Sequence, residues 1–175
     1  MHAVILAAIL HLMPSPSPAW GETPVGFRHR MELIARSIDT ATRTVRTDHR
    51  RQLALAVVVV FWGEGRFSPH VQSGVRRGDG GRAICLAQAH QGELTELEWL
   101  SLAGLDAEST TSCAIVAAQR LKRAWRYCRD LDPKFSWQEA MVLYGTGRTC
   151  RAEESHWKNI FVDRGMKHSA LVARR

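Results

Sequence analysis

The sequence predicts a mainly α-helical domain with a central buried helix and a small loop and hairpin region. In several segments apolar residues recur every three or four positions, which is typical of amphipathic helices. Another segment is apolar on all sides, and a glycine-containing stretch over 68–82 interrupts the helical pattern. Of the 175 residues, 45% are hydrophobic, enough for one folded domain with a substantial core. We find no internal repeat and no second domain.

The first twenty residues resemble a secretory signal peptide. Residues 3–13 are apolar but too few to span a bilayer as a helix, and a stretch rich in proline and serine follows them. Only His2 precedes the apolar run, so the n-region is poor. We expect cleavage near residues 19–21, a signal peptide over 1–20, and no stable membrane insertion after processing. The alternatives are an uncleaved tail and a misassigned start.

Two helices are expected next. Residues 28–45 have the spacing of an amphipathic helix, and Asp48 is a candidate cap for a second helix over 49–63. The apolar face of the first helix carries Met31, Ile34, Ile38 and Ala41.

The second of these helices is expected at the centre of the domain, because it is apolar nearly all round from Leu53 to Trp62. A strand over 57–61 is the alternative, since β-branched residues favour sheets. The unbroken length from Arg50 favours the helix.

The rest of the chain alternates loops and helices. Residues 68–82 are expected to form a loop with a short hairpin at 78–81. Two segments, 95–98 and 136–139, have the spacing of a capping box and start helices. The expected helical ranges are 110–129, 136–144 and 151–163, so that the domain covers 21–165 and a basic tail covers 166–175.

Four cysteines are present: Cys85, Cys113, Cys128 and Cys150. No pair has the CxxC spacing, so we expect no zinc site. An even number beside an export signal favours two disulfides, with four reduced thiols as the alternative. Cys113 and Cys128 lie on one expected helix about 22 Å apart, too far for a bond. We favour the pairs Cys85–Cys113 and Cys128–Cys150.

The net charge is +7, from 24 lysines and arginines against 17 acidic residues. Such a charge suits an acidic partner: nucleic acid, an anionic membrane surface, or the anionic polymers of a cell wall. A nucleic-acid-binding helical domain has only this charge in its favour, because no motif of that kind is present.

Glu64 is the most informative residue. It lies where the apolar helix meets a loop, an unusual place for a charge. Burial disfavours the charged form of a carboxyl group and raises its pKa. A raised pKa lets a carboxylic acid donate a proton near neutral pH. The alternative is an exposed glutamate at a helix end.

Three short segments follow one another in a fixed order. Residues 64–69 read EGRFSP, residues 80–88 read GGRAICLAQ, and residues 140–147 read AMVLYGTG. Together they resemble the catalytic domain of lytic transglycosylases and goose-type lysozymes, which shows Glu-Ser-x-Phe-x-Pro, then a glycine-containing loop ending in Gly-Leu-Met-Gln, then Ala-x-x-Tyr-Asn-x-Gly. The order and approximate gaps agree across residues 50–150. The resemblance implies a lysozyme-like fold that cleaves the β-1,4 bond between N-acetylmuramic acid and N-acetylglucosamine in peptidoglycan.

The resemblance also implies roles for single residues. Glu64 matches the family's general acid, Gln88 the glutamine that closes the sugar-binding loop, and Tyr144 the tyrosine that faces the glutamate. A lytic transglycosylase needs one carboxylic acid, because the substrate's N-acetyl group can assist and its 6-hydroxyl can attack to give a 1,6-anhydro product. If water attacks instead, Asp79 on the glycine-rich loop is the candidate second carboxylate; otherwise it is a turn residue.

The sequence departs from the family pattern near each motif. Gly65 replaces a serine, Cys85 and Ala87 replace glycine and methionine, Gly145 replaces asparagine, and Ala114 stands where many members carry asparagine. The leading hypothesis is a monomeric peptidoglycan-cleaving enzyme, exported to the periplasm or the extracellular space, that acts on glycan strands without metal or cofactor. The alternative is a degenerate, non-catalytic wall-binding or scaffold module on the same fold.

Overall fold

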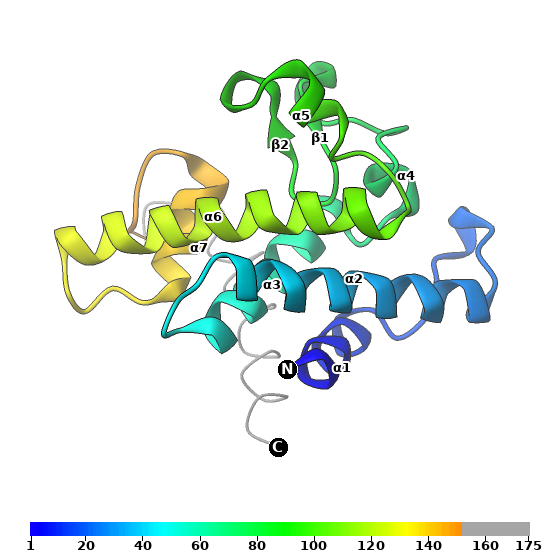
Figure 1. The fold of residues 1–175 in the computed structure, drawn as a ribbon, viewed down its shortest axis with the longest axis horizontal. Coiled ribbons are helices and arrows are strands. Elements are labelled where there is room, and N and C mark those ends of the chain that lie inside the picture. Colours follow the sequence, from blue (N-terminus) through cyan, green and yellow to red (C-terminus); the bar gives the residue numbers. More distant parts are fainter. Residues whose placement is uncertain (152–175) are drawn as a thin grey trace.

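The structure, a computed structural model, describes residues 1–151 and is mainly helical, as expected. Helix α3 (Arg50–Gly65) lies at its centre. Four helices pack around it: α1 (His2–Leu12), α2 (Pro24–Thr44), α6 (Ala107–Leu131) and α7 (Trp137–Thr146). Figure 1 shows α2 and α6 lying alongside each other across the molecule. The lysozyme-like identity of this arrangement stays a prediction.

A small β region lies to one side of the helices, at the top of Figure 1. Strands β1 (Ala83–Ile84) and β2 (Ala89–His90) pair antiparallel, with Ala83 opposite His90. An isolated bridge joins Gly78 to Ala83, so the expected turn over 78–81 is present ahead of the strands. The short helical elements of this region are α4 (Pro69–Gln72), α5 (Glu96–Leu100) and the 3-10 turns Asp79–Gly81 and Gln91–Glu93.

The central helix is buried on every side. All nine residues from Leu53 to Phe61 are buried, and the strand considered for residues 57–61 is wrong. Each leucine, valine or phenylalanine side chain of this run contributes about 1.5–3 kcal/mol when fully buried, which outweighs the modest helix propensity of valine. Glu64 follows in the last turn of this helix, which ends at Arg66 in a left-handed conformation.

Helix boundaries differ from the expectation where caps decide them. α2 begins at Pro24, after Thr23 caps it by accepting a hydrogen bond from Gly26 N. α6 begins at Ala107, because Asp106 accepts from Ser109 N. The prediction that Asp48 caps α3 is wrong: His49 occupies that position without a side-chain cap. Both capping boxes, Thr95–Glu98 and Ser136–Glu139, are confirmed.

The N-terminal helix α1 packs against α2 and α3, with Ile5, Ala8 and Ile9 buried. Cleavage near residues 19–21 stays a prediction. No helix in residues 1–151 is long and apolar enough to cross a membrane. The expected helix over 151–163, the domain end at 165 and the basic tail lie, apart from Arg151 itself, outside the described residues.

Both expected disulfides are present. Cys85–Cys113 joins the β1–β2 connection to α6, and Cys128–Cys150 joins α6 to the segment after α7. They span sequence separations of 28 and 22 residues, for which loop closure predicts about 3–4 kcal/mol of stabilisation each. Disulfides of this kind are typical of oxidising compartments and fit an exported protein.

Candidate active site

Glu64 and Gln88 line the same cavity, of about 460 Å³. Glu64 comes from the last turn of α3, and Gln88 from the connection between β1 and β2. Trp20, from the 3-10 turn Pro18–Trp20, also lines this cavity. The other lining residues are Gly65, Arg66, Ser68, Val71, Arg76, Arg77 and Gly78.

The carboxyl group of Glu64 is poised to hold a proton near neutral pH. Burial, and to a lesser degree the negative charge of Asp79, raises the pKa of Glu64 from 4.5 to about 7. Within residues 1–151, no hydrogen bond or ion pair reaches this carboxyl group. No ion pair within these residues therefore opposes the effect of burial, and the acid form of Glu64 persists up to a pH of about 7.

The side chain of Gln88 is fixed between the carbonyl oxygen of Cys85 and Gly78. Its backbone N and its Nε2 each lie 3.0 Å from the carbonyl oxygen of Cys85, to which both donate. A Cβ added at Gly78 would lie 1.9 Å from Oε1 of Gln88. Glycine at position 78 thus leaves the room that the Gln88 amide occupies beside the Glu64 cavity.

The connection that carries Gln88 is anchored from two helices. Cys85 is bonded to Cys113 of α6, and the hydroxyl of Tyr144 in α7 donates to the carbonyl oxygen of Ala87 over 2.7 Å. Cys85 has φ +60°, a conformation that favours glycine, which is the residue that the resembling family carries there. The disulfide to Cys113 offsets the cost of placing a side chain in this conformation.

The glycine that follows Glu64, Gly65, has a steric reason. A Cβ at this position would lie 3.2 Å from both Cα and O of Leu86, and 2.9 Å from Cδ2 of the same residue. Two of these contacts are with backbone, which cannot move aside as a flexible side chain can. The close approach of α3 and the β1–β2 connection therefore requires glycine after Glu64.

Replacing Gly65 with serine, the residue usual in the family, should destabilise the protein instead of restoring a polar support. We expect a loss of about 1–3 kcal/mol in the free energy of unfolding, because the added atoms push against the Leu86 backbone. Urea unfolding measures it, with Gly92→Ser as the control, since a Cβ at Gly92 meets nothing within 4 Å. Equal stability of Gly65→Ser and the wild type would contradict the steric argument.

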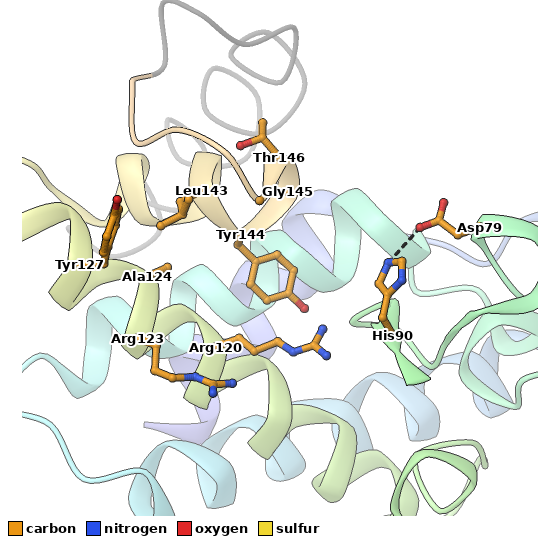
Figure 2. A pocket seen from close by; sticks show the side chains of 11 residues that line it. Asp79, His90, Arg120, Arg123, Ala124, Tyr127, Leu143, Tyr144, Gly145 and Thr146 are labelled. Atoms are coloured by element: carbon orange, nitrogen blue, oxygen red, sulfur yellow. Dashed lines mark ion pairs between the residues drawn. The ribbon is translucent and has the colours of Figure 1, made fainter. Parts of the chain in front are cut away.

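Asp79 and Tyr144 line a second cavity, of about 640 Å³, together with His90. Figure 2 shows the Tyr144 ring reaching from α7 toward the side where Asp79 and His90 lie. Oδ2 of Asp79 lies 2.9 Å from Nε2 of His90, and both side chains are about half exposed. The structure thus brings the four predicted residues together as two pairs in two cavities. Tyr144 contacts the Gln88 loop and does not line the Glu64 cavity.

Asp79 has the features of a turn residue as well as those of a site residue. It starts the 3-10 turn Asp79–Gly81, has φ +47°, and its carbonyl oxygen accepts from Nε of Arg82. Its negative charge nevertheless reaches Glu64, because it contributes to the raised pKa of that carboxyl. Its role as a second carboxylate stays a prediction.

Arg30 supports the Glu64 loop and was not predicted from the sequence. This buried side chain donates through Nη1 to the carbonyl oxygen of Phe67, over 2.6 Å, and to Oε1 of Gln72, over 3.3 Å. Two further hydrogen bonds, of 2.7 and 2.9 Å, join it to both carboxylate oxygens of Glu22. Arg30 lies four residues before Ile34 and so shares the apolar face of α2, a buried charge that sequence spacing could have indicated.

Some basic side chains of α6 bond to other segments or line a cavity. Nζ of Lys122 donates to the carbonyl oxygens of Val45 and Arg46, just past the end of α2. Arg120 and Arg123 line the second cavity, facing the same space as Tyr144 (Figure 2). In residues 1–151 no group of three or more His, Cys, Asp or Glu side chains could hold a metal ion.

Comparison with protein families, with curated proteins and with solved structures finds no match for this chain.

Proposed function

We propose that this protein cleaves the β-1,4 bond between N-acetylmuramic acid and N-acetylglucosamine in peptidoglycan, with Glu64 as the single general acid, in the manner of a lytic transglycosylase. The observation that carries the proposal is a carboxyl group with a pKa of about 7 that lines an open cavity without a cationic partner among residues 1–151. A group of this kind can protonate a leaving oxygen at the pH of most extracytoplasmic spaces.

In the proposed reaction, the Glu64 carboxylic acid gives its proton to the glycosidic oxygen as the bond from that oxygen to C1 breaks. The acetamido oxygen of the same sugar stabilises the positive charge that develops at C1. The 6-hydroxyl then attacks C1 and returns its proton to the Glu64 carboxylate, which leaves a 1,6-anhydro end. No water is consumed, so no second carboxylate is needed.

The products of wall digestion test this reaction. Mass spectrometry of purified peptidoglycan treated with the protein should show muropeptides with 1,6-anhydro ends, which are 18 mass units lighter than their reducing counterparts because water is not added. Reducing ends would instead indicate hydrolysis, with Asp79 as the group that activates water. Absence of released muropeptides from any wall preparation would contradict both enzymatic versions.

A non-catalytic wall-binding module is the second candidate, and one observation favours it. The polar groups that the family places around the glutamate are replaced by Gly65, Ala114 and Gly145, and Ala114 is fully buried. Glu64 therefore has fewer polar side chains around it than the family pattern provides. Under this alternative, the protein binds wall polymer and releases nothing.

A further inference from the structure

The cavity that contains Glu64 also contains three arginines that the proposed reaction does not use. Arg66 ends α3, and Arg76 and Arg77 lie between α4 and the hairpin. Among the described residues that line this cavity, Glu64 is the only carboxylate. Within the described part of the chain, no ion pair joins any of these arginines to a carboxylate. Their charge is therefore not used to neutralise an acidic side chain there.

Two of the three guanidinium groups are held in place by aromatic rings. Arg66 lies over the ring of Trp62, 4.2 Å from its centre, and Arg77 lies over the ring of Trp99, 5.1 Å from its centre. Nε of Arg77 also donates to the carbonyl oxygen of Gly74. Stacking uses the flat face of a guanidinium and leaves its in-plane N–H donors for an anion.

Trp99 makes this position rigid. It is buried, and its indole N–H donates to the carbonyl oxygen of Ala89 in β2 over 2.9 Å. Arg77 therefore rests on a side chain that is itself anchored in the small sheet. A pre-positioned arginine loses less conformational entropy on binding than a mobile one, which favours a planar carboxylate as the ligand.

We propose that Arg66, Arg76 and Arg77 form a subsite for the carboxylate that muramyl sugars carry and chitin-type sugars lack. This proposal rests on the proposed function. The carboxylate has two sources in peptidoglycan: the free lactyl group of a glycan stripped of peptide, and the acidic groups of an attached peptide stem. The subsite lies next to the bond that Glu64 cleaves. It selects acidic glycan over neutral N-acetylglucosamine polymers.

Binding by Glu64→Gln protein tests the subsite without cleavage. Three probes are titrated by calorimetry: an N-acetylglucosamine oligomer, peptide-free glycan of alternating N-acetylglucosamine and N-acetylmuramic acid, and the same glycan with peptide stems. Adding Arg77→Gln or Arg76→Gln should weaken binding of the acidic glycans about tenfold and leave the neutral oligomer within twofold. Arg77→Lys, which keeps the charge but loses the planar fork, should give an intermediate loss.

The two acidic probes distinguish the source of the carboxylate. A loss confined to peptide-bearing glycan assigns the subsite to the stem, and a loss confined to peptide-free glycan assigns it to the free lactyl group, because an attached stem converts that carboxylate to an uncharged amide. An equal loss for both means that the arginines accept a carboxylate from either source. Arg126→Gln is the control, because Arg126 is exposed on α6 and lies outside the Glu64 cavity.

Four results would overturn the subsite: unchanged binding in the arginine variants, an equal loss for neutral and acidic probes, the same loss in Arg126→Gln, or no binding of any acidic glycan. Wall cleavage by the wild type is scored separately. Cleavage with unchanged binding in the arginine variants removes the subsite and keeps the enzyme. Selective binding without cleavage keeps the subsite and removes the enzyme.

Discussion

Replacing Glu64 with glutamine should lower kcat/KM for wall cleavage by about 10²–10⁴-fold, the usual contribution of a general acid. Glutamine keeps the size and the hydrogen-bonding ability of the side chain but has no proton to give. Turbidity of a wall suspension and release of soluble muropeptides measure the loss. Binding of the glycan should survive, because the lining of the cavity is otherwise unchanged.

The matched control is Glu96→Gln, an exposed glutamate in the first turn of α5 and outside both cavities. It removes the same charge and should keep wild-type activity. Activity of the Glu64→Gln variant equal to that of the control would exclude Glu64 as the acid. If neither the wild type nor the variants release muropeptides while all bind the wall, the non-catalytic alternative replaces the proposed enzyme.

The dependence of wild-type kcat/KM on pH should follow the ionisation of Glu64. Because Glu64 acts in its protonated form and its pKa is about 7, kcat/KM should fall about tenfold for each pH unit well above 7. A plateau that extends to pH 9 would contradict protonated Glu64 as the active form.

The sequence was sufficient to predict those features that depend on local pattern. A run without a polar face, from Leu53 to Phe61, can be satisfied only at the centre of a helical domain, and α3 lies there. The capping boxes followed from spacing. Helix length excluded only a bond between Cys113 and Cys128, and of the two connectivities that remained, the favoured one is confirmed. The sequence also predicted that Glu64 lies where the buried helix meets a loop. In the structure a cavity lies there.

Contacts between distant segments could not be predicted in the same way. The close approach of Leu86 to Gly65, the bond from Tyr144 to Ala87, and the buried Arg30 all depend on tertiary packing. The sequence shows glycine at position 65 and cysteine at position 85, but not the contacts that explain them. In the structure, each has a steric or covalent reason in the loop that carries Gln88.

Tyr144 and Asp79 line a different cavity from the one that Glu64 and Gln88 line. Tyr144 was expected to face Glu64, but its hydroxyl is engaged by the Gln88 loop, and its ring lines the neighbouring cavity with Asp79 and His90. Asp79 nonetheless influences Glu64 through its charge. The Asp79 charge raises the Glu64 pKa through space, without a hydrogen bond between the two side chains. The spacing of the two residues in the sequence does not predict this effect.

Glutamine at position 64 should also make the protein more stable than the wild type at alkaline pH. The folded state keeps the Glu64 proton up to a pKa of about 7, whereas an exposed glutamate has an ordinary pKa of 4.5 and releases it earlier. Between these values the folded state holds more protons than the unfolded state, so the free energy of unfolding falls as the pH rises. The difference between about 7 and 4.5 corresponds to about 3 kcal/mol, which is lost as the pH rises from 4.5 through about 7.

Chemical denaturation of the wild type and of Glu64→Gln at pH 4, 6 and 8 measures this effect. Glutamine does not ionise, so the variant does not lose this stability, and its advantage over the wild type should grow from pH 4 to pH 8 by about 3 kcal/mol. Glu96→Gln, at an exposed position, should follow the wild-type curve. Parallel curves for the wild type and Glu64→Gln would mean that Glu64 is not held in its acid form by burial. Because this measurement needs no substrate, it tests the state of the carboxyl group independently of whether the protein cleaves peptidoglycan.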